Sequence, residues 1–137
     1  MSERTEAGEP VLVTLSTPAR RSLVDGLVRN RGASAAAPIL DLDSPDADIA
    51  GFLAGAAHSD TGFVARTSSG QRAVAIVAAT AAALCGDDIH TALSRPDVAF
   101  LSSLKPPAVE AVRSVLLAIE TEDTDRLIDA LRVLSRG

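Results

Sequence analysis

Aromatic, imidazole and thiol side chains are scarce in this chain. It contains no Trp or Tyr, three Phe, two His and a single Cys. One cysteine cannot form an intramolecular disulfide, and so few Cys and His residues supply no structural zinc cluster. Bases of single-stranded nucleic acid would find almost no aromatic ring on which to stack. We therefore predict no metal site, no cofactor and a reducing, cytoplasmic location.

Basic residues and long apolar runs are also in short supply. The chain has 18 acidic and 13 basic residues, a net charge of −5 and a pI of about 4.9, which disfavours contact with nucleic acid. The longest weakly polar stretch, residues 73–85, is shorter than the roughly 18 to 20 residues of a membrane span. We expect neither a nucleic-acid nor a membrane partner. Lys105 is the one lysine, and this preference for Arg is typical of a GC-rich, bacterial genome.

Length and composition predict one folded unit. A chain of 137 residues that is 47% hydrophobic can bury one core. Residues 1–9 are polar, lack the apolar run of a signal peptide and are expected to form a disordered tail. Residues 10–137 are expected to form a single globular domain.

Apolar spacing favours helices over most of this domain. Helices are predicted from Pro18 to about Arg31, from Pro45 to about Ala57, and from Ser69 to Cys85, the last being apolar almost all round and thus central. Ser68 and Gln71 match a capping box for the central helix. We predict a mainly α, single-domain helical bundle. In an α+β alternative, two or three short strands occupy the N-terminal half, at residues 11–15, 39–42 and 63–65.

The C-terminal third predicts an antiparallel helical hairpin over residues 106–136. Its apolar positions recur at helical spacing, with a turn at residues 121–123. On this reading Leu117 and Val133 fall outside the buried stripes, and Leu117 lies beside Arg113 on the solvent side. The three residues therefore define a candidate interaction surface that a symmetric homodimer would cover. Burial of Leu117 and Val133 under the N-terminal half is an equal alternative.

Acidic residues follow the apolar segment at 38–40. Asp41 and Asp43 are spaced as a carboxylate pair that can hold Mg²⁺ together with a substrate phosphate. With Thr67 and the later Gly86-Asp87-Asp88, they faintly resemble the haloacid dehalogenase superfamily of phosphatases. That resemblance implies Asp41 as nucleophile, Asp43 as acid/base, and Asp87 or Asp88 as metal ligands. Here, however, Gly86-Asp87-Asp88 follows a predicted helix instead of a strand, and Lys105 comes too late to be the family's lysine.

A second polar segment opens the central helix. Ser68, Ser69, Gly70 and Arg72 combine free backbone N–H groups, hydroxyls and a cation, which together suit an anion. The segment is similar to the signature segment of ABC-type ATPases, although the chain has no phosphate loop of the form G-x-x-x-x-G-K-[ST]. An ordinary helix cap is the simpler interpretation.

No complete catalytic constellation is present, so we name no catalytic residue and expect no enzymatic activity. The favoured function is that of a cytoplasmic helical module for protein–protein interaction or regulation. The alternative is a small phosphate- or nucleotide-binding protein, or a Mg²⁺-dependent phosphohydrolase, that uses Asp41, Asp43 and the loop at Ser68.

Overall fold

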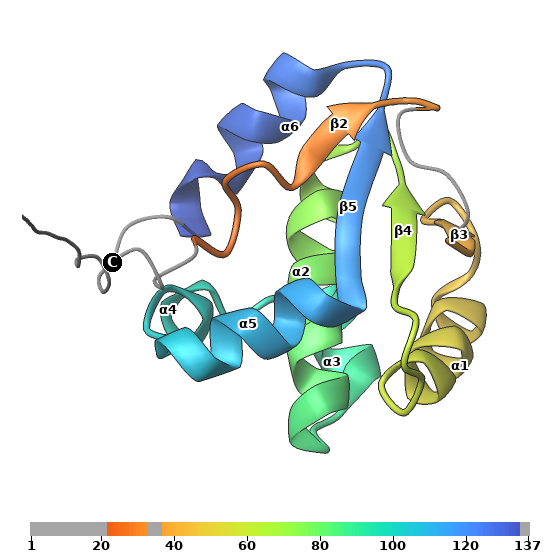
Figure 1. The fold of residues 1–137 in the computed structure, drawn as a ribbon, viewed down its shortest axis with the longest axis vertical. Helices are drawn as coiled ribbons and strands as arrows, with labels where there is room; N and C mark the ends of the chain where they lie inside the picture. Colours follow the sequence, from red (N-terminus) through yellow and green to blue (C-terminus); the bar gives the residue numbers. More distant parts are fainter. Residues whose placement is uncertain (1–21, 33–36, 135–137) are drawn as a thin grey trace, which may run out of the picture.

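A four-stranded parallel sheet organises the protein. A computed structural model describes residues 22–32 and 37–134, and its strands follow the order β2-β5-β4-β3 (Figure 1). The elements in chain order are β2 (Val28–Asn30), β3 (Ile39–Asp41), α1 (Asp46–Ala56), β4 (Phe63–Arg66), α2 (Gly70–Cys85), α3 (Ile89–Ser94), α4 (Val98–Ser102), α5 (Pro106–Val115), β5 (Leu116–Thr121), α6 (Thr124–Leu131) and the 3₁₀ turn η3 (Arg132–Leu134).

The predicted mainly α bundle is therefore wrong, because the molecule is an α/β protein. Of the expected strands, those at 39–42 and 63–65 are confirmed as β3 and β4, while residues 11–15, like the expected tail at 1–9, lie outside the described residues.

Two segments expected to be helical contain strands. The described part of the expected helix over residues 18–31 is not helical: residues 22–31 form turns followed by β2. In the expected hairpin, residues 116–121 form β5 between α5 and α6. All six residues of β5 except Leu117 are buried. A parallel strand covered on both faces loses the alternating pattern that identifies a strand, so its apolar run reads as part of a helix.

Helix α2 is the centre of the core, as its composition predicts. Nine of its residues are buried, and it packs against α1, α3, α5 and α6. Ser69, not Ser68, caps it by accepting the N–H of Arg72, and Gly86 ends it in the left-handed conformation with φ of 75°. Inside the helix the Thr80 hydroxyl donates to the carbonyl of Ile76 at 2.7 Å, so this buried polar group is satisfied.

The two faces of the sheet differ. Val28, Ile119, Ala65 and Leu40 lie in register across the four strands on the face that packs against α2. The helices α1 and α6 also contact α2, and Figure 1 shows α2 behind the sheet with no helix in front of β4. The opposite face, here called the helix-free face, carries a row of alternating charge made by Arg29, Glu120, Arg66 and Asp41.

No helix in the described part of the chain has the length and apolar character needed to cross a membrane.

Gly62 provides a test of this architecture, because it precedes β4 with φ of +71°. A Cβ atom at Gly62 would lie 2.8 Å from the Ser114 carbonyl oxygen. We predict that Gly62→Ala lowers the free energy of unfolding by about 1–3 kcal/mol. Gly51 is the matched control, since it lies inside α1 with open space around it, and Gly51→Ala should raise stability by about 0.5–1 kcal/mol. Urea unfolding midpoints of both variants measure the difference, and equal midpoints would contradict the described packing.

Candidate ligand site at the carboxyl edge of the sheet

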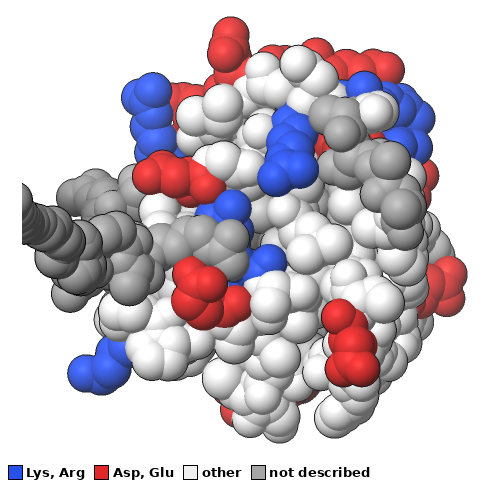
Figure 2. All heavy atoms as spheres, viewed as in Figure 1, with Lys and Arg blue, Asp and Glu red and all other residues white. Residues whose placement is uncertain are grey.

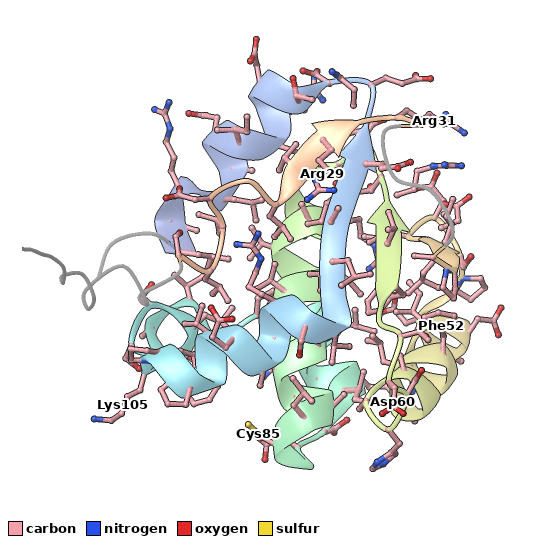
Figure 3. The ribbon with its side chains drawn as sticks, in the orientation of Figure 1. Arg29, Arg31, Phe52, Asp60, Cys85 and Lys105 are labelled. Atoms are coloured by element: carbon pink, nitrogen blue, oxygen red, sulfur yellow. The ribbon has the colours of Figure 1, made fainter. Side chains whose placement is uncertain are left out.

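All four strands are parallel, so their carboxyl ends meet at one edge of the sheet. Open α/β sheets bind ligands at this edge. Here it holds a cavity of about 80 Å³ to which every strand, or the residues directly after it, contributes. The lining residues are Arg31, Asp41, Asp43, Arg66, Thr67, Ser68, Thr121 and Glu122. Figure 3 shows Arg31 at this end of the molecule.

An ion pair connects Arg66, which lines the cavity, to the buried side chain of Glu120. Glu120 on β5 is completely buried, and its Oε1 lies 2.9 Å from a guanidinium nitrogen of Arg66 on β4. The same oxygen accepts the backbone N–H of Gly32 at 3.1 Å, which ties the segment after β2 to the sheet. Charge-assisted hydrogen bonds of this kind fix the orientation of both partners. The Nε of Arg66 is buried and has no hydrogen-bond partner among the described residues.

Asp41 and Asp43 form the acidic side of the cavity. The Oδ1 of Asp41 accepts the backbone N–H of Asp43 at 2.9 Å, so a tight turn brings both carboxylates to the surface after β3. Arg72 braces this turn from α2, since its Nε donates to the Leu42 carbonyl and its guanidinium lies 3.0 Å from Asp46. Both carboxylates of the predicted pair thus remain exposed at a fixed position.

The predicted anion-binding segment divides into two parts. Ser68 lines the cavity, whereas Ser69 caps α2. The Arg72 side chain is bound to the turn after β3 through the Leu42 carbonyl. Gly70 is covered by α6, because a Cβ atom there would lie 2.6 Å from the Cβ of Ala130. Thr67 lines the cavity with Ser68, and its hydroxyl accepts the N–H of Ser69. From this segment the cavity therefore receives the hydroxyls of Thr67 and Ser68, and a third lining hydroxyl belongs to Thr121 of β5.

The candidate interaction residues Leu117, Val133 and Arg113 lie on three different elements. Leu117 is the unpaired residue of a bulge in β5 and packs toward Gly62. Val133 lies in η3 and is 42% exposed. Arg113 is buried in α5 and donates to the carbonyls of Ser22 and Asp25.

The motifs of the phosphatase resemblance are only partly assembled. Asp41, Asp43 and Thr67 line one cavity. Gly86-Asp87-Asp88 instead follows the far end of α2, a helix of 16 residues and thus about 24 Å in length. Sequence reasoning missed Glu120, whose charge directly after the apolar run of residues 116–119 was the one available signal of a buried ionic contact.

A metal at this edge would have few protein ligands. The described residues contain no group of three or more His, Cys, Asp or Glu side chains arranged to hold a metal ion. Asp41 and Asp43 still match Mg²⁺, because this ion commonly takes only one or two carboxylates and completes its shell with water and substrate phosphate.

Neither a family model, nor a curated protein, nor a solved structure matches this chain. The fold and the cavity therefore define its class: an α/β protein with a polar site at the carboxyl edge of a parallel sheet.

The buried pair generates a stability prediction. Replacing Glu120 by Ala leaves the Arg66 guanidinium and the Gly32 N–H without their acceptor. Because the Arg66 side chain is 27% exposed, we expect a loss of about 3 kcal/mol, at the lower end of the range for a broken buried pair. Glu122→Ala is the control, since its pair with Arg31 is exposed and should contribute less than about 1 kcal/mol. Denaturant unfolding of the two variants tests this, and a Glu120→Ala loss as small as that of the control would argue against the pair.

Proposed function

We propose that this chain is a cytoplasmic protein that binds a small phosphate-bearing molecule together with Mg²⁺. One observation carries the proposal: residues after all four strands converge on a single polar cavity at the edge where α/β sheets bind ligands. The exposed free thiol of Cys85 is compatible with a reducing compartment.

The cavity offers complementary groups to the two halves of such a ligand. Asp41 and Asp43 present carboxylate oxygens, which are the ligands that Mg²⁺ prefers. The hydroxyls of Thr67 and Ser68 and the guanidinium of Arg66 provide donors for phosphate oxygens. The presence of both carboxylates and hydrogen-bond donors in one cavity supports a metal–phosphate pair over either component alone.

Charge explains why the cation is required. Arg31 and Arg66 are already paired with Glu122 and Glu120, so Asp41 and Asp43 leave the edge acidic. A bare phosphate would be repelled by these carboxylates, whereas Mg²⁺ bound to them reverses the local charge. A volume of about 80 Å³ suits a phosphoryl group, and the rest of the ligand would extend into solvent. We propose binding only, since the second acidic motif of the phosphatase pattern lies elsewhere.

The expected ligand behaviour is cooperative. In thermal unfolding, phenyl phosphate should raise the melting temperature only when Mg²⁺ is present, because each component completes the site of the other. At a ligand concentration 100-fold above Kd the stabilisation should be about 2.7 kcal/mol. Asp43→Asn should abolish the Mg²⁺-dependent part. Asp60→Asn, an exposed carboxylate in the turn before β4, should leave it intact. No shift with millimolar phenyl phosphate and Mg²⁺ would overturn the proposal.

A second candidate, the predicted interaction module, draws support from the helix-free face. Parallel sheets normally have both faces covered, yet α1, α2 and α6 occupy one side. Ile39, Val64 and Ala118 lie in register on the other side, where Val64 and Ala118 are buried and Ile39, on the edge strand, is 45% exposed. Figure 2 views this face and shows mainly uncharged atoms at its centre. Figure 3 shows Arg29 lying over β5 on the same side. A second copy of the chain in a symmetric dimer would cover the exposed side chain of Ile39.

Two isoleucines of nearly equal exposure allow a matched test of this dimer. Ile39 is 45% exposed on the helix-free face, and Ile128 is 46% exposed on α6. We expect wild type and Ile128→Glu to sediment as dimers in the micromolar range and Ile39→Glu to sediment as a folded monomer. A wild-type monomer under these conditions, or a dimer that survives Ile39→Glu, would exclude this interface.

A further inference from the structure

A second cavity lies away from the carboxyl edge, between the C-terminal half of α2 and the short helices α3 and α4. Its volume is about 300 Å³, at the lower end of the range for sites that bind small molecules. Its apolar lining comes from Ala78 and Ala82 of α2, Ala92 of α3, and Leu101 of α4. Ala78 and Ala82 lie about 12–18 Å along α2 from its first residue, so this cavity is separate from the proposed phosphate site.

The polar lining of this cavity is mainly acidic. Asp87, Asp88 and Asp97 contribute three carboxylates, against one cation from Arg95. Asp88 caps α3, and hydrogen bonds from the Thr91 hydroxyl and from the N–H groups of Thr91 and His90 hold the pKa of its carboxyl below the ordinary value. Asp97 caps α4 by accepting the N–H of Phe100.

Asp87 differs from the two capping aspartates. Within the described residues its carboxylate takes part in no hydrogen bond and no ion pair, although its backbone N–H donates to the Ala82 carbonyl. The fold thus fixes the backbone at this position and leaves the negative charge of the side chain available to a bound molecule. Because Asp87 is exposed to water, its attraction for a bound cation is screened and modest in size.

Phe100 also has an unusual position. The other described phenylalanines, Phe52 and Phe63, pack edge to face with ring centroids 5.3 Å apart. Phe100 lines the cavity and is 42% exposed. Aromatic rings attract cations through the negative potential of their faces, so the ring and the carboxylates favour the same charge in a ligand.

We propose that this cavity binds a small organic cation with an apolar body, such as an aryl or alkyl amine or an amidine. The apolar part would contact Ala78, Ala82 and Leu101, and the cationic group would lie near Asp87 and the ring of Phe100. This inference concerns a second site and does not depend on the proposed phosphate-binding function.

Three probes of similar size and different charge test it: benzamidine, benzyl alcohol and benzoate. In NMR titrations of ¹⁵N-labelled protein, benzamidine should shift the amide signals of Ala78, Ala82 and Ala92. Benzyl alcohol should bind about tenfold more weakly, a difference of about 1.4 kcal/mol, and benzoate more weakly still. Equal affinities for the three probes, or shifts confined to other residues, would overturn the proposal.

Variants separate the contribution of charge from that of shape. Asp87→Asn keeps the shape of the side chain and should weaken benzamidine binding about fivefold while leaving benzyl alcohol unaffected. Phe100→Leu should also weaken benzamidine more than benzyl alcohol. Asp48→Asn is the control, because Asp48 is an exposed carboxylate in the first turn of α1 and does not line the cavity. If Asp87→Asn binds benzamidine as wild type does, the assignment of the cation to Asp87 is wrong.

Discussion

Parallel strand pairing is the constraint on which the rest of this molecule depends. Parallel neighbours cannot be joined by tight turns, so each connection must carry the chain back along the sheet. The connection from β3 to β4 contains α1, and the one from β4 to β5 contains α2 to α5. These helices bury one face of the sheet and give the core its central member, α2. The same constraint brings all the carboxyl ends to one edge, where residues far apart in sequence become neighbours.

The Glu120–Arg66 pair connects this constraint to the candidate site. Both side chains lie on the helix-free face of the two central strands, and Gly32 reaches the same carboxylate from the segment after β2. A buried charge must be paired and hydrogen-bonded to be tolerated. The pair therefore fixes the orientation of Arg66, which also lines the polar cavity. Stability of the sheet and geometry of the cavity depend on the same contact.

The sequence was informative where a pattern is local. The helix after Ser69, its central position, its end at Gly86 and the short strands at β3 and β4 all follow from nearby residues. The strand at β5 could not be recognised, because burial on both faces removes its alternation and leaves an apolar run that fits a helix equally well. Of the site, Asp41, Asp43, Thr67 and Ser68 were found in separate motifs. Their meeting with Arg31, Arg66 and Glu122 depends on strand order, which local patterns do not encode.

The position of β5 has a consequence for how the chain folds. β5 lies between β2 and β4, so the four-stranded sheet cannot be completed until residues 116–121 have been synthesised. Arg31 and Glu122, whose side chains meet beside β2, are 91 residues apart in sequence. Contacts of such long range slow folding, because the chain must lose much of its freedom before they form. During synthesis on the ribosome, β2 would have no neighbouring strand until β5 emerges. Until then, α1 and α2 would have to protect the exposed edges of β3 and β4 from aggregation.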